Sequence, residues 1–217
     1  MSKSQFDMVK GEITVCFTID QLRKLYAEST HEGKEFLESI CTEGKEFFKA
    51  PTLDDYKSIK TYLDACVALG VEPLNEEAIL KAGVDKHVIA LMKLETVSRA
   101  LWGRKFMPVP QPKWDGHTYY WWPWFVFYTK EEVDKLVKEH NEGNDSVAAL
   151  FGGDATNGAS AGFGDLNTSY RPAHTNAYVG FRLCQETEER ARYFASQFAT
   201  LWAEYLAFNF LVGERIF

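Results

Sequence analysis

The chain has 217 residues, 46% hydrophobic and 25% charged, which is the composition of a globular protein with one or two domains. Its formal net charge of −7 argues against a nucleic-acid binder, because such proteins carry a basic surface. The sequence has no apolar run of the about 18 residues that a membrane span needs, and its start lacks a signal-peptide core, so we expect a soluble cytoplasmic protein.

The first 55 residues predict an N-terminal strand and helix extension. A short strand is expected over residues 12–17, and Asp20 can cap the helix that follows. HEGKEF at 31–36 and TEGKEF at 42–47 lie eleven residues apart, which is about three helical turns. This echo predicts one amphipathic helix over residues 31–48.

Three further helices are expected before residue 104. Helical spacing from Ile59 to Val67 ends at Gly70 and Pro73, the usual stop signals. A short helix ends at Gly83. The stretch KHVIALMKLETVSRALWG then predicts a longer helix, which is apolar on most sides and is therefore expected at the centre of the fold.

Residues 108–116 contain three prolines and predict a linker. The aromatic and β-branched residues at 117–128 predict a strand, and Pro123 restricts it to a sheet edge or a bulge. The TKEE segment that follows is typical of a capping box, with Thr129 as N-cap and Glu132 reaching back to it.

The last third of the chain begins with six glycines over residues 141–170, which predict a Gly-rich loop insertion. A strand over residues 176–184 and one long helix over residues 186–208 are expected after it. We therefore predict an α+β fold with a helical N-terminal half and a small antiparallel sheet packed by a long C-terminal helix. The main domain would span residues 56–217.

Cysteine and histidine spacing gives no sign of a metal site. Cys16, Cys41, Cys66 and Cys184 include no C-x-x-C pair, and none of the five histidines has ligand spacing to them. We expect no metal and no cofactor, and we expect the cysteines to be reduced core residues.

Two catalytic motifs lack the context that their chemistry needs. Ser160 in GASAG, with Asp165 and His174 after it, has the order of a hydrolase triad, but neither flank supplies the strand and helix of a nucleophile elbow. No G-x-x-x-x-G-K-[ST] loop is present either. The sequence therefore favours a protein that is not an enzyme.

The segment TYYWWPWFVFY places aromatic residues on both faces of one strand. Tyr120, Trp122 and Trp124 share a face by strand alternation. One aromatic face can pack beneath the last helix. The other would meet the N-terminal helices, another subunit or a flat ligand.

Polar and aromatic residues also gather in SYRPAHTNAYVGFR. Arginine can pair with phosphate in a bidentate fork and can stack on rings. The alternative is that Arg182 pairs with a carboxylate of the final helix and that His174 is an ordinary loop residue. Together with the aromatic strand, this segment gives the candidate ligand-binding set: Tyr120, Trp122, Trp124, Tyr170, Arg171, His174, Asn176, Tyr178 and Arg182.

Four segments, YLDACVALGVEP, YYWWPWF, AGFGD and VGFRLCQETEERARYFASQF, occur in this order between residues 62 and 198. Together they resemble an uncharacterised family common in phages and prophages of gut Bacteroidales, with its DAC–LG–P, YYPWF, GFGF and VGSRLCF pattern. The resemblance covers residues 60–208. The sequence differs from the family pattern at Gly180-Phe181-Arg182, where the family usually has Gly-Ser-Arg. Residues 129–160 form an insertion relative to that pattern.

The resemblance implies a phage accessory protein in the cytoplasm of the bacterial host. Joined to the residue chemistry, it predicts a non-enzymatic, homo-oligomeric binding protein that sequesters a small nucleotide-like host defence signal. The alternative is a protein–protein module, an inhibitor of a host enzyme or a virion component, that uses the aromatic strand as its interface.

Overall fold

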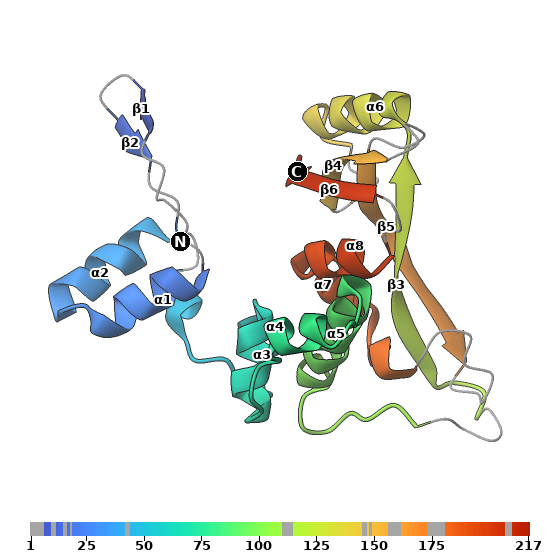
Figure 1. Ribbon diagram of the computed structural model, residues 1–217, viewed down its shortest axis with the longest axis horizontal. Coiled ribbons are helices and arrows are strands. Elements are labelled where there is room, and N and C mark those ends of the chain that lie inside the picture. Colours follow the sequence, from blue (N-terminus) through green and yellow to red (C-terminus); the bar gives the residue numbers. More distant parts are fainter. Residues whose placement is uncertain are drawn as a thin grey trace. The chain divides into compact units, whose positions relative to one another are not determined.

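The computed structural model describes residues 7–9, 12–14, 17, 19–41, 44–109, 115–144, 147, 149–155, 162–172, 181–206 and 210–217. The chain divides into two compact units, Met1–Ala50 and Pro51–Phe217 (Figure 1). The sequence pattern predicts this boundary slightly later, after residue 55.

The first unit contains a β-hairpin and two α-helices: β1 (Asp7–Val9), β2 (Glu12–Thr14), α1 (Ile19–Glu28) and α2 (His31–Ile40). The Tyr26 hydroxyl bonds to Glu38 Oε1 at 2.5 Å, which ties the two helices together. The single helix predicted over residues 31–48 is wrong, because a separate 3₁₀ helix covers Gly44–Phe48. Gly44 has φ +53°, a left-handed conformation that an α-helix cannot continue through.

The second unit holds the remaining elements: a 3₁₀ helix (Tyr56–Ser58), α3 (Tyr62–Leu69), α4 (Glu76–Lys81), α5 (Lys86–Trp102), β3 (Tyr119–Tyr128), α6 (Lys130–Asn141), β4 (Ala149–Ala155), β5 (Gly162–Pro172), a second 3₁₀ helix (Phe181–Leu183), α7 (Glu188–Gln197), α8 (Ala199–Leu206) and β6 (Phe210–Arg215). Helix α5 lies at the centre, as its apolar sequence predicts, and Leu94, Val97 and Leu101 on it have no exposed surface. Helix α8 packs on α5, and α7 lies against β3 and β5 (Figure 1).

The four strands of the second unit form an antiparallel sheet in the order β3-β5-β4-β6. The predicted position of β3 is confirmed, since it lies at an edge of this sheet. Trp121 exchanges backbone hydrogen bonds with Gln185 on the side away from β5, at 3.0 and 2.8 Å. Backbone groups alternate along a strand, so Pro123 also faces this outer side and its missing N–H costs no bond to β5.

The register between β3 and β5 shifts between Trp124 and Phe125. Beyond the shift, the Phe125 ring stacks on Phe163 of β5 at 5.0 Å and lies 5.3 Å from the ring of Trp202 on α8. This part of the sheet therefore carries one aromatic face into the main core beneath α8.

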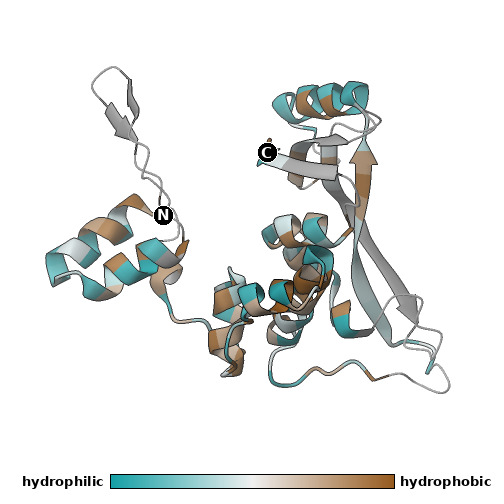
Figure 2. Cartoon of the chain, in the orientation of Figure 1, coloured by the Kyte–Doolittle hydropathy of each residue, from teal (hydrophilic) through white to brown (hydrophobic). Residues whose placement is uncertain are grey.

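Helix α6 covers the opposite face at this end of the sheet. Its predicted capping box is confirmed: Thr129 N–H donates to Glu132 Oε2 at 2.8 Å, and Glu132 N–H donates to Thr129 Oγ1 at 3.3 Å. The helix is hydrophilic over most of its length, with a few hydrophobic turns (Figure 2). Val133, the buried residue of α6, packs with Leu150 of β4.

Two glycines of β5 allow this close packing. A Cβ on Gly162 would lie 2.5 Å from Val133 Cγ2, and a Cβ on Gly164 would lie 2.9 Å from the carbonyl oxygen of Ala149. The prediction of a Gly-rich loop over residues 141–170 is wrong for residues 149–155 and 162–170, because these belong to strands β4 and β5. These glycines serve close packing rather than turns.

Two other predictions change near the C-terminus. Residues 181–183 form a 3₁₀ helix instead of the end of a predicted strand, and residues 173–180 lie outside the described residues. The final helix is divided at Phe198, the C-cap of α7, whose ring is buried in the core. The α+β fold class itself is confirmed, with a helical N-terminal half and C-terminal helices against an antiparallel sheet. Among the helices of the described residues, none combines the length and apolarity of a bilayer span.

Candidate functional site

A short irregular segment, residues 104–109, follows α5 and is here named the strap. The chain leaves α5 at Gly103, which has φ +72°. A Cβ at this position would lie 2.8 Å from the carbonyl oxygen of Leu53, so glycine is required for both conformation and space. Arg104 then forms an exposed ion pair with Asp54 at 3.0 Å. The start of the strap is therefore held against the segment that precedes α3.

The far end of the strap is held by Tyr120, near the start of β3. The Tyr120 hydroxyl donates to the Val109 carbonyl at 3.1 Å and accepts from the Val109 N–H at 3.0 Å. The Tyr120 ring is 4% exposed and meets the Phe106 ring edge-on at 5.6 Å. Phe106 in turn meets Trp102 of α5 edge-on at 6.3 Å. This chain of rings fixes the distance between the strap and the strand.

A tight turn positions the residues that enter β3. The Asp115 carboxylate accepts hydrogen bonds from the backbone N–H groups of His117 at 3.0 Å and Thr118 at 2.7 Å, and also from the Thr118 hydroxyl. The Thr118 side chain and backbone, then the His117 N–H, lower the pKa of Asp115 to about 2. The His117 side chain lies exposed beside this turn, with Nε2 3.6 Å from Asp115 Oδ2.

The segment before α7 brings an acidic residue to the same place. Trp102 Nε1 donates to the Cys184 carbonyl at 2.6 Å, and Gln185 Nε2 donates to Ser98 Oγ at 2.9 Å. Gln185 is fully buried. Burial also raises the pKa of the Cys184 thiol to about 12. These bonds fix the backbone from which Glu186 emerges.

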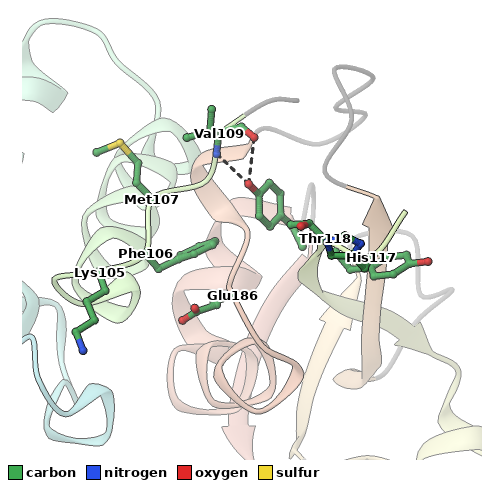
Figure 3. A pocket seen from close by; sticks show the side chains of 9 residues that line it. Lys105, Phe106, Met107, Val109, His117, Thr118 and Glu186 are labelled. Atoms are coloured by element: carbon green, nitrogen blue, oxygen red, sulfur yellow. Dashed lines mark hydrogen bonds between the residues drawn. The ribbon is translucent and has the colours of Figure 1, made fainter. Parts of the chain in front are cut away.

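Together the strap, the start of β3 and Glu186 line an open recess of about 430 Å³, here named the strap pocket (Figure 3). Its lining comprises Lys105, Phe106, Met107, Val109, His117, Thr118, Tyr119, Tyr120 and Glu186. Aromatic rings, two nitrogen-bearing side chains and one carboxylate thus face a single recess. Such a lining suits a planar organic molecule with polar groups at its ends.

One predicted site residue, Tyr120, lines this pocket, and two others reach the same end of the sheet. The Cα of Arg171 is paired with Tyr120 in the β3–β5 register, and the Cα of Tyr170 is paired with Trp121. The backbone of this polar segment therefore runs beside the strand that forms one wall of the pocket.

The other predicted residues are not gathered at the strap pocket. Trp122 is partly buried against the core, and Trp124 is 51% exposed outside the pocket lining. Arg182 lies exposed, with Nη1 3.4 Å from Glu95 Oε2 of α5, so its carboxylate partner is not on the final helix. His174, Asn176, Tyr178 and the hydrolase candidate Ser160 lie outside the described residues. A shared aromatic and arginine site stays a prediction.

Of the nine lining residues, the sequence-based set contains only Tyr120; the side chains that it missed include Lys105, Phe106, His117 and Glu186. From the sequence alone, the strap is predicted only as the residues that lead into a proline-rich linker. Glu186 is predicted only as a residue in the first turn of a helix. The signals that point to them are a helix stop at Gly103 followed by Arg-Lys-Phe-Met-Pro, and a turn-forming Asp-Gly shortly before the aromatic strand.

Within the described parts of the chain, no group of three or more His, Cys, Asp or Glu side chains is placed to hold a metal ion. Comparison of the chain with family models, with curated proteins and with solved structures gave no match. The functional proposal therefore rests on the geometry of the strap pocket.

Proposed function

We propose that this chain is a phage-encoded, non-enzymatic binding protein that takes a small planar, phosphate-bearing molecule, such as a nucleotide-derived host signal, into the strap pocket. The observation that carries the proposal is the pocket itself. Its volume of about 430 Å³ lies in the range of small-molecule sites, about 300–1,000 Å³. Its walls are braced by the Tyr120–Val109 bonds, so little ordering is needed on binding.

The pocket lining includes groups that can bind both the planar ring and the phosphate of such a ligand. Phe106 offers ring surface on which a flat heterocycle can stack. Lys105 and His117 offer nitrogen donors, which suit a phosphate group. Arg171, whose Cα is paired with Tyr120, belongs to the same end of the sheet.

The proposal places the protein in the cytoplasm of the bacterial host, where nucleotides are dissolved. Cys66 and Cys184 are buried as thiols, which agrees with a reducing compartment. Sequestration needs tight binding and no chemical step, so the ligand should be recovered unchanged after the protein is denatured.

Isothermal titration calorimetry with purified nucleoside monophosphates tests the proposal. At least one should bind, and Lys105→Ala should weaken it about tenfold, the scale of a charge-assisted hydrogen bond. Lys135→Ala is the matched control, because Lys135 is an exposed residue of α6 outside the pocket lining. Absence of binding by every nucleotide up to millimolar concentration would refute the proposal.

A protein–protein module is the second candidate, and the exposure of Trp124 favours it. A half-exposed tryptophan on an edge strand is a typical interface anchor. The homo-oligomer expected from the sequence would use this residue between copies. Light scattering should then give a multiple of the 24.8 kDa chain mass for the wild type and the single chain mass for Trp124→Ala. An unchanged mass, with nucleotide binding intact, would dismiss Trp124 as an anchor between copies.

A further inference from the structure

The strap pocket contains a carboxylate that is ion-paired with a neighbouring arginine. Glu186 is the acidic member of the nine lining residues. Arg190 Nη1 lies 3.2 Å from Glu186 Oε2, and the same nitrogen donates to the Trp102 carbonyl at 3.1 Å. The Arg190 guanidinium also lies over the Tyr56 ring at 5.4 Å. Because Arg190 is held by the Trp102 carbonyl and the Tyr56 ring, it restrains the carboxylate, whose side chain is 48% exposed and so accessible to a ligand.

The position of Glu186 in the pocket suggests what it would meet. Figure 3 shows the carboxylate below the Phe106 ring, between the end of the strap that carries Lys105 and the strand that carries His117. A flat heterocycle stacked on Phe106 would therefore turn an edge toward this carboxylate. Its charged substituent would extend toward the nitrogen donors at the rim.

An ionised carboxylate accepts hydrogen bonds and cannot donate them. The edge that faces Glu186 must therefore present N–H donors, and a lone pair directed at it would be repelled. A guanine-type base has a ring N–H and an exocyclic amino group side by side on one edge, which match the two carboxylate oxygens. An adenine-type base has a ring nitrogen lone pair beside its amino group.

We propose that the strap pocket selects guanine-type over adenine-type nucleotides and that Glu186 is the residue that determines this specificity. The inference rests on the proposed nucleotide-binding function. Glu186 would accept from the base edge, Phe106 would stack on its face, and Lys105 would meet the phosphate.

Calorimetric titration of GMP, IMP and AMP into the full chain tests the inference. A bidentate side-chain pair with a base discriminates by about 1–3 kcal/mol, so GMP should bind about tenfold or more tighter than AMP. IMP keeps the ring N–H and lacks the 2-amino group, and its affinity should fall between the two. Glu186→Gln should remove the preference, because the amide offers an N–H where the ligand needs an acceptor.

The matched control is Glu188→Gln. Glu188 lies two positions along the chain and pairs with Arg192 at 2.7 Å, outside the pocket lining. This variant should keep the GMP preference of the wild type. Glu186→Asp keeps the charge, but its side chain is one methylene shorter and the carboxylate no longer reaches the base edge. This variant should therefore lose most of the preference for GMP over AMP. It provides the test if Glu186→Gln fails to fold.

The outcomes separate the two proposals. Equal affinity of the wild type for GMP and AMP would overturn the guanine preference and leave the binding function standing. A GMP preference that survives in both Glu186 variants would overturn the role of Glu186. No binding of any of the three nucleotides would overturn the inference, and absence of binding by every other nucleotide as well would remove the proposed function itself.

Discussion

The contact between α6 and the sheet predicts a specific cost for one added methyl group. In Gly162→Ala, the new Cβ would lie 2.5 Å from Val133 Cγ2, whereas carbon atoms in contact normally lie about 3.5–4.0 Å apart. One of the two groups must therefore move by about 1 Å. Val133 cannot turn aside easily, because a valine in a helix has one strongly preferred rotamer and this one is buried.

The size of the effect follows from two opposing contributions. Overpacking a core site costs about 1–3 kcal/mol. Replacing glycine by alanine returns about 0.4–1 kcal/mol by reducing the freedom of the unfolded chain. The net loss should be about 1–2 kcal/mol, which corresponds to a fall of about 2–8 °C in the melting temperature for a protein of this size.

Urea denaturation of a double-mutant cycle measures this contact. Val133→Ala alone should cost about 1.5 kcal/mol for the methyl groups that it removes. In the double variant, the methyl group added at position 162 should occupy the vacated space, so the combined loss should be about 1–2 kcal/mol smaller than the sum of the single losses. Gly152→Ala is the control, since its Cβ would meet other atoms only at 3.8 Å or beyond, and it should raise stability by about 0.4–1 kcal/mol.

Two results would refute this reasoning. The first is a Gly162→Ala variant as stable as the wild type. The second is strict additivity of the Gly162 and Val133 losses, which would mean that α6 does not lie against this part of β5.

Three further predictions concern the pocket and its surroundings. Tyr120→Phe removes both bonds to Val109, so it should cost about 1–2 kcal/mol and speed hydrogen exchange of the Val109 amide; an unchanged exchange rate would contradict the bracing role. The pKa of Asp115 is lowered from 3.8 to about 2, chiefly by its hydrogen bonds from Thr118. The ionised carboxylate therefore contributes its full stabilisation at pH values above 3.8, the pKa in the unfolded chain, and this contribution is lost as the pH falls through about 2. Urea midpoints should therefore show Asp115→Asn less stable than the wild type at neutral pH, with the gap narrowing in acid; a gap that does not depend on pH would count against this. Cys184, with its pKa raised to about 12, should resist iodoacetamide at pH about 8 until the chain is unfolded in urea, and rapid labelling of the native protein would show that the thiol is not buried.

Much of the helical part of the fold could be predicted from the sequence. Helix α5 and the start of α6 follow from local signals: an apolar stretch that ends at Gly103, and the Thr129–Glu132 capping box. These signals act over a few residues, so they do not depend on the rest of the chain. The position of β3 at the sheet edge could be predicted for the same reason, because Pro123 lacks an N–H wherever it lies.

Strands β4 and β5 could not be predicted, because local preference assigns their glycines to turns. Gly162 and Gly164 are needed for the close approach of α6, of Val147 and of the neighbouring strand, which no sequence window contains. Phe198 interrupts the final helix for a similar reason, since its ring is buried in the core although the apolar stripe continues past it.

The candidate site was predicted in part. Tyr120 belongs to the predicted ligand-binding set, and it lines the pocket with its hydroxyl bonded to Val109. The strap could not be recognised, because what makes it a wall of a pocket is its attachment to a strand about ten residues further along the chain. Glu186 reaches the pocket through the bonds of its neighbours to α5 and β3, which are tertiary contacts.

The most direct test of the account is a nuclear magnetic resonance titration of the ¹⁵N-labelled chain with GMP. Binding in the strap pocket predicts that the amide signals of Phe106, Thr118, Tyr119 and Glu186 shift together, while the indole signal of Trp124 stays in place. Shifts centred on Trp124, or no shift at millimolar GMP, would contradict it.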